Sequence, residues 1–254
     1  MRPLVRLAFA FSLYGAVAWL STGSKALANE DVYDPTACRT DTHRMVYVAL
    51  GRSVFRWSVD ELPVITKLDQ NRQTEAPTPP DPSEPEGCPG NPVRALMVGL
   101  TIRYGGVAGS ESREPRNIGV ALSAVSPNFW GMQLLTENAF EDTCDKWNLR
   151  NVLPEGLIAC TRPSSNVAVP PSEWATRYRA DPDTYSSPYG RPFLITCIPT
   201  NIYRCDVRYK LFDTVNLSYR FWRKDIPIAK AIEVDRIIRL EATTAVVSDF
   251  KWPS

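Results

Sequence analysis

Residues 205 to 221 carry the most regular alternation of apolar and polar side chains in the sequence. From Cys205 to Leu211 every second side chain is apolar, and the pattern resumes from Val215 to Phe221 after Phe212-Asp213-Thr214. A period of two places alternate side chains on opposite faces of a strand. The pattern therefore predicts an antiparallel hairpin with one buried face.

A second hairpin is predicted near the start of the chain, where the runs Met45–Leu50 and Ser53–Val59 flank Gly51-Arg52. A Gly-X pair between two β-branched and aromatic runs is typical of a type II′ turn. Short apolar runs predict four further strands, at residues 94–104, 117–125, 156–161 and 193–198.

The segment after Pro227 predicts a helix, because its apolar side chains recur at helical spacing. Asp235 interrupts the apolar stripe, which consists of Ile228, Ala231, Ile238, Ala242 and Ala245, with Val234 and Ile237 at its flanks. Residues 128–150 fit either an irregular strand or a short helix. The expected fold class is α+β and strand-rich, with one or more antiparallel sheets and a C-terminal amphipathic helix packed on a sheet.

Two proline-rich segments, 77–92 and 163–192, predict long surface loops, because proline fits neither a helix interior nor a central strand. The first has seven prolines in sixteen residues and contains Cys88. It could instead be a linker that subdivides the chain. A disulfide at Cys88 favours a pinned loop, and thus one globular domain over 29–254.

The first 28 residues predict a secretory signal peptide. Arg2 and Arg6 precede an uncharged apolar run from Leu7 to Leu20, and the small-residue site Ala26-Leu27-Ala28 follows. The run is shorter than the roughly 20 residues that cross a bilayer, although a retained membrane anchor is an alternative. We expect a mature periplasmic or secreted protein that begins near Asn29 and has no membrane span.

Six cysteines follow the signal, and an even count in an exported chain predicts three disulfides. The runs around Cys197 and Cys205 resemble adjacent strands, so these two are expected to pair. The pairs Cys144–Cys160 and Cys38–Cys88 then follow by elimination, although sequence alone does not fix the connectivity. With one histidine in the chain, a Cys/His zinc site is not favoured, and we expect no metal or cofactor.

The composition also limits the chemistry. Without residues 1–28 the formal charge is −2, from 26 basic and 28 acidic side chains, which does not favour a nucleic-acid partner. The single histidine, His43, has no G-x-S-x-G nucleophile to serve, so we expect no enzyme of that kind. Carboxylate catalysis stays an alternative. The densest acidic cluster, interpreted as a solvated turn or a cation site, is Glu137, Glu141, Asp142 and Asp145.

The outward side of the last predicted strand suggests a contact surface. Trp222 lies there beside Arg220 and Arg223. Exposed aromatic and arginine side chains are what protein interfaces concentrate. These three residues are therefore candidates for binding a partner, unless a helix or loop covers the tryptophan.

Three stretches, VYVALGRSVFRW from Val46, GCPGNP from Gly87 and VNLSYRFWRKDIP from Val215, together with the signal peptide, resemble a group of small exported proteins of Gram-negative bacteria. Members of that group are often encoded beside type VI secretion effectors and act as periplasmic immunity proteins. The resemblance implies a protein that binds and blocks a secreted toxin, but it assigns no functional residues. A carboxylate-dependent hydrolase and a structural or assembly component of the cell envelope are the alternatives.

Overall fold

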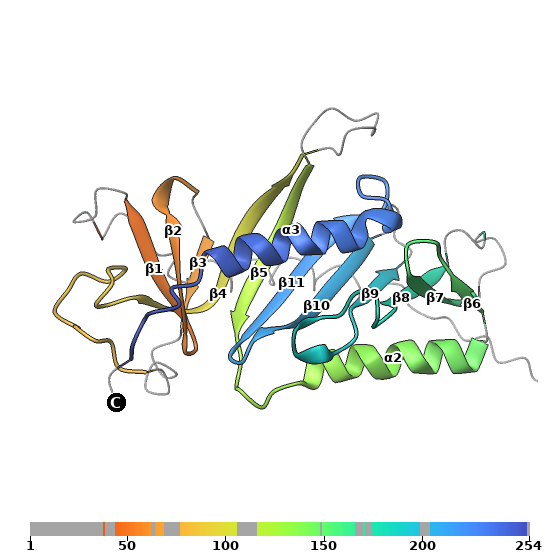
Figure 1. The fold of residues 1–254 in the computed structure, drawn as a ribbon, viewed down its shortest axis with the longest axis horizontal. Coiled ribbons are helices and arrows are strands. Elements are labelled where there is room, and N and C mark those ends of the chain that lie inside the picture. Colours follow the sequence, from red (N-terminus) through yellow and green to blue (C-terminus); the bar gives the residue numbers. More distant parts are fainter. Residues whose placement is uncertain are drawn as a thin grey trace, which may run out of the picture. The chain divides into compact units, whose positions relative to one another are not determined.

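The computed structural model of the chain describes residues 38, 44–61, 64–68, 77–105, 116–147, 149–165, 170, 174–198 and 204–252 (Figure 1). The chain divides into two compact units, Met1–Asp31 and Val32–Ser254, and all described residues belong to the second. The predicted signal peptide and His43 lie outside the described residues. Among the residues described, no helix combines the length and the apolar character that crossing a membrane requires.

The described strands form one eleven-stranded sheet with the order β2-β1-β4-β5-β11-β10-β9-β8-β7-β6, and β3 pairs with β4 beside this path. The strands are β1 (Met45–Leu50), β2 (Ser53–Ser58), β3 (Val64–Lys67), β4 (Val93–Tyr104), β5 (Arg116–Ala124), β6 (Arg150–Val152), β7 (Leu157–Arg162), β8 (Ala175–Ala180), β9 (Leu194–Ile198), β10 (Arg204–Phe212) and β11 (Val215–Trp222). The strand-rich α+β class is thus confirmed.

The sheet is mixed, so the expectation of purely antiparallel pairing was wrong. Strands β1 and β4 run parallel, with Val48 opposite Val93 and Ala49 opposite Arg94. Parallel neighbours need a long crossover connection. The chain supplies one here, because β2, β3 and the turns of residues 77–92 lie between the two strands.

Both predicted hairpins are confirmed. Strands β10 and β11 pair from Arg204–Trp222 to Phe212–Val215. Strands β1 and β2 are joined at Gly51, whose φ is +60°, while Arg52 has no positive φ. A positive φ at the first turn residue alone is what a type II′ turn requires. A side chain at Gly51 would also meet Thr214, 2.6 Å from an added Cβ.

Helix α3 (Ala231–Thr244) packs on one face of the sheet, which we call the first face. Its buried side chains join the main core with the inward side chains of β10 and β11, as the stripe after Pro227 predicts. Asp235, on the same stripe, is fully buried. Its carboxylate accepts hydrogen bonds from the hydroxyls of Tyr185, Tyr209 and Tyr219 and from Arg239. These hydrogen bonds fix α3 against the loop that contains Tyr185 and against strands β10 and β11.

Helix α2 (Gly131–Trp147) occupies the region for which the sequence allowed either a strand or a short helix. It packs on the opposite, second face, over β7 to β10. Only Gln133, Phe140 and Thr143 are buried in this helix. The acidic cluster is not a solvated turn, because it lies on the helix, where Glu137 pairs with Arg191 and Glu141 with Arg179.

The proline-rich segment 163–192 is not a single loop. Strand β8 lies inside it, pairs with both β7 and β9, and buries Tyr178 and Ala180 in the core. The prolines stand outside the strand itself, where they break no ladder hydrogen bond. Residues 77–92 form turns whose local hydrogen bonds include Gly87 N–H to the carbonyl of Asn91.

The three disulfides join Cys38 to Cys88, Cys144 to Cys160 and Cys197 to Cys205, as predicted. The first pins the turns of residues 77–92. The second ties α2 to β7, and the third links the neighbouring strands β9 and β10. Such crosslinks are typical of proteins outside the cytosol.

Because α2 buries few apolar side chains, we expect the Cys144–Cys160 crosslink to contribute strongly to stability. It closes a loop with a sequence separation of 16, so replacing both cysteines by alanine should lower the free energy of unfolding by about 3 kcal/mol. Urea unfolding monitored by circular dichroism measures this loss. The corresponding change at Cys197 and Cys205, with a separation of 8 and strands already paired, should cost less. A larger loss for that second pair would contradict the argument.

Candidate functional site

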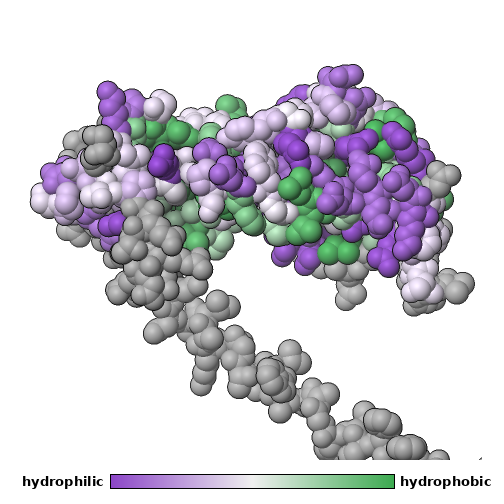
Figure 2. All heavy atoms as spheres, turned by 90° about the horizontal axis from the view of Figure 1, so that it is seen from below, coloured by the Kyte–Doolittle hydropathy of each residue, from purple (hydrophilic) through white to green (hydrophobic). Residues whose placement is uncertain are grey.

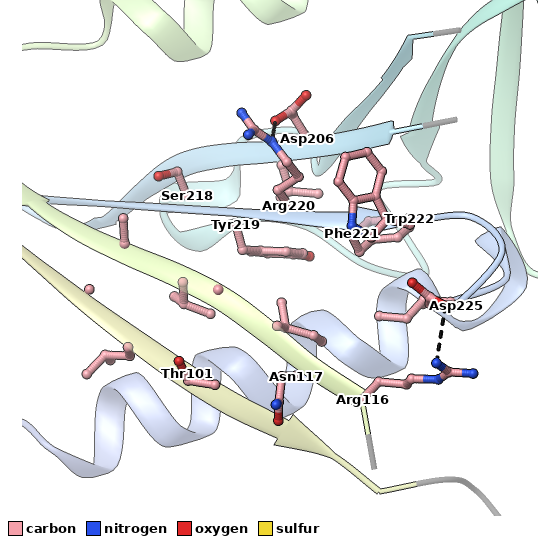
Figure 3. Close-up of a pocket in the computed structure, with 18 of the residues that line it drawn as sticks. Thr101, Arg116, Asn117, Asp206, Ser218, Tyr219, Arg220, Phe221, Trp222 and Asp225 are labelled. Carbon is pink, nitrogen blue, oxygen red and sulfur yellow. Dashed lines mark hydrogen bonds and ion pairs between the residues drawn. The ribbon is translucent and has the colours of Figure 1, made fainter. Parts of the chain in front are cut away.

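The second face carries a groove beside the part that helix α2 covers. Helix α2 lies over β7 to β10, while α3 lies on the first face, so the outward side chains of β4, β5 and β11 have no helix above them. The cavity has a volume of about 790 Å³ and also reaches Asp206 and Arg208 of β10 (Figure 3). In this view α3 passes behind the strands.

The floor of the groove consists of small side chains. The register places Gly99 opposite Ala121 and Ala121 opposite Ser218, which makes one row across β4, β5 and β11. Thr101 lies opposite Gly119 in the next row. A Cβ added at Gly119 would meet nothing within 4 Å. The backbone of the sheet is therefore accessible to a molecule that approaches from this side.

Exposed apolar side chains border the groove. On one side Val64, opposite Gly99, is 59% exposed, and Met97 is exposed two residues before Gly99 on β4. On the other side Phe129, just before α2, and Met132, in its first turn, line a small cavity that shares Arg208 with the groove. Figure 2 shows apolar side chains on both sides of a hollow in this surface. A groove with such borders can bury apolar side chains of a ligand.

The charges on this part of the second face are mainly positive. Arg103, Arg204, Arg208 and Arg220 point outward from β4, β10 and β11, and Asp206 is the acidic side chain among the described outward residues of these strands. Asp206 accepts from Arg204 at 3.1 Å and from Arg220 at 2.8 Å. Among the described residues, Arg103 and Arg208 have no acidic partner. At one end Arg116 pairs with Asp225 at 3.4 Å.

Two of the three predicted binding residues line this groove. Arg220 is exposed, and Trp222 is half-buried on the outward side of β11, away from α3. Figure 3 shows both beside Asp206. Arg223 lies in the turn after β11 and is not among the residues that line the groove. Of the three residues predicted to bind a partner, the groove therefore contains Arg220 and Trp222 but not Arg223.

Sequence reasoning missed the contribution of β4 and β5. Asn117, Gly119, Ala121 and Ser123 alternate with buried side chains, which marks them as the outward set of β5. That signal was present in the sequence. What the sequence did not show is that β5 pairs with β11, which places these small side chains beside Arg220.

The carboxylates that line the groove are paired. Asp206 and Asp225 are both in ion pairs with arginine. Within the described part of the chain, no three His, Cys, Asp or Glu side chains are grouped so that they could hold a metal ion. The arrangement can hold an apolar ligand that carries negative charge.

No protein-family model matches the chain, and neither a curated protein nor a solved structure shows significant similarity to it. No residue role can therefore be transferred from a relative.

Proposed function

We propose that the protein is an exported binding protein that holds a protein partner in the groove of the second face, and that it acts as a periplasmic immunity protein that blocks a secreted toxin. The observation that carries the proposal is the groove itself. It combines an accessible floor, exposed apolar borders and Arg208, which has no acidic partner among the described residues. Large exposed apolar surface next to arginine is typical of a protein interface.

Two further features support binding outside the cytosol. Three disulfides and a paired eleven-stranded sheet make a rigid platform, and a preorganised surface loses little entropy when a partner binds. The predicted signal peptide of residues 1–28 would deliver the chain to an oxidising compartment. Steric blockage of a toxin needs a surface of this kind and no catalytic group.

The alternative of a carboxylate-dependent hydrolase has less support. Such enzymes need one carboxyl group that can give up a proton and a second that is free to act as base or nucleophile. Asp206 and Asp225 are held by arginines, as are Glu137 and Glu141 on α2. Each of these four carboxylates already has a cationic partner.

The test is to capture the partner and then to block the groove. Tagged protein of residues 29–254 is used as bait in an envelope extract of its own organism, and the captured protein is purified and titrated. We expect Gly119→Trp to raise the dissociation constant at least tenfold, because the indole would occupy the floor. The same variant should lose protection of cells that export the toxin.

Gly105→Trp is the matched control. Gly105, like Gly119, has nothing within 4 Å of an added Cβ, but it lies outside the groove. It should bind and protect like the wild-type protein, with equal unfolding free energies for both variants. Capture of no stoichiometric partner, or full protection by Gly119→Trp, would overturn the proposal.

A further inference from the structure

We infer that the groove accepts an amphipathic α-helix that carries acidic side chains. This inference rests on the proposed function, because it names the kind of element that the partner would present. The argument uses the width of the groove, the placement of its apolar borders and the sign of its charge.

The width fits a single helix. Strands β4, β5, β11 and β10 are successive neighbours in the sheet, so the three spacings between them span about 14 Å, at about 4.8 Å each. An α-helix with its side chains has a diameter of about 10–12 Å. The cavity of about 790 Å³ corresponds to between one and two helical turns of that diameter. An extended strand would leave much of this width unfilled.

The apolar borders suit the apolar stripe of an amphipathic helix. Side chains at positions i, i+3, i+4 and i+7 of a helix form a stripe that can enter a groove. Here the floor of Gly99, Gly119 and Ala121 permits close approach, and Val64 and Met132 stand at opposite sides. Contacts from both borders would bury the stripe as a helix settles on the sheet.

The positive charges of the groove favour acidic side chains on the polar side of the bound helix. Four arginines point outward from β4, β10 and β11 beside Asp206, and at the end of the groove Asp225 pairs with Arg116. Arg208 is exposed and borders both the groove and the small cavity under α2. A glutamate or aspartate on the bound helix would supply the partner that Arg103 and Arg208 lack among the described residues. A basic helix would be repelled.

A second copy of this chain is the competing occupant. The outer side of α2 carries exposed Leu134 and Leu135 near its start and exposed Asp142 and Asp145 near its end. That helix therefore has some of the required chemistry. Sedimentation equilibrium of the purified protein separates the two cases. A dimer that Gly119→Trp dissociates would overturn the inference of a foreign helix, and we expect a monomer.

The direct test selects ligands without assuming their sequence. Random 20-residue peptides displayed on phage are bound to oxidised protein of residues 29–254, after depletion on Gly119→Trp. We expect the selected peptides to be acidic, with leucine-like side chains at helical spacing, and to become helical by circular dichroism on binding. Selection of basic or proline-rich peptides, or of none that needs the groove, would overturn the inference.

Charge reversal gives a second, quantitative test on a selected peptide. Arg208→Glu should raise its dissociation constant about tenfold, and binding should weaken as NaCl increases. Arg56→Glu, an equal change at an exposed position of β2, should leave binding unchanged. Equal effects of both variants would contradict a role for the charge of the groove. If a toxin is captured but the peptides are not acidic helices, only this inference fails. If such peptides bind but no partner protein exists, the proposed immunity function fails.

Discussion

Replacing Asp235 by alanine should lower the free energy of unfolding by about 3–5 kcal/mol, the usual cost of removing one partner from a buried charged network. The fully buried carboxylate accepts from Tyr209 and Tyr219 at 2.9 Å each, and from Tyr185 and Arg239. Alanine would leave three hydroxyl groups without their acceptor, and a buried donor without a partner is costly. Urea unfolding monitored by tryptophan fluorescence measures the change.

Two variants define the comparison. Glu241→Ala alters an exposed acid on the same helix and should change the unfolding free energy by less than about 0.5 kcal/mol. Asp235→Asn keeps one acceptor oxygen and should give an intermediate loss. A loss below about 1 kcal/mol for Asp235→Ala would show that the tyrosines find other acceptors.

The same network predicts that stability falls steeply above pH 10. Burial, and then the negative charge of Asp235, raise the pKa of Tyr209 and of Tyr219 well above the ordinary value of 10. The pKa of Tyr185 is raised for the same reasons. In the unfolded chain these tyrosines ionise near pH 10, whereas in the folded protein they stay protonated.

The direction of this change in stability with pH follows from the number of protons that the folded and unfolded states bind. Below pH 10 both states hold the phenol protons, so this contribution to stability is complete. As the pH rises above 10 the unfolded state loses protons that the folded state keeps, and unfolding becomes easier. The decline is about 1.4 kcal/mol per pH unit for each tyrosine, or about 3 kcal/mol per pH unit for Tyr209 and Tyr219 together.

Unfolding by urea at pH 9, 10 and 11 measures this slope, and absorbance of the phenolate reports when the tyrosines ionise. Ionisation of the buried pair should coincide with unfolding. Tyr209→Phe should reduce the slope by about half of the pair's contribution. A slope equal in Tyr209→Phe and wild-type protein would mean that other groups cause the alkaline loss.

Local patterns predicted the hairpins, the C-terminal helix and most strands, because each of these elements has its signal within a few residues. The 205–221 alternation and the stripe around Asp235 are examples. The sequence did not distinguish helix from strand in the region of α2, because its apolar stripe is weak. Ion pairs with Arg179 and Arg191 and a disulfide help to hold this helix in place. Strand β8 was missed because prolines surround its six residues.

The candidate site was harder to predict, because it depends on which strands become neighbours. Arg220 and Trp222 were identified from the outward side of one strand, and they do line the groove. The floor comes from Gly99, Gly119 and Ala121, and only the pairing of β4 with β5 and of β5 with β11 brings it there. Strand order is a tertiary property that no local period encodes.

The segment after α3 completes the sheet, although it contains neither a strand nor a helix. Phe55 and Val246 form a β-bridge, Arg56 N–H donates to Ala245, and Val247 N–H donates to Val54, so the segment occupies the outer edge of β2. The indole of Trp252 donates to the carbonyl of Arg52 at 2.9 Å. An unprotected edge can add strands from other molecules. Residues 245–252 therefore shield the edge of β2 from other strands. A C-terminal fusion that preserves these contacts has to begin after Trp252.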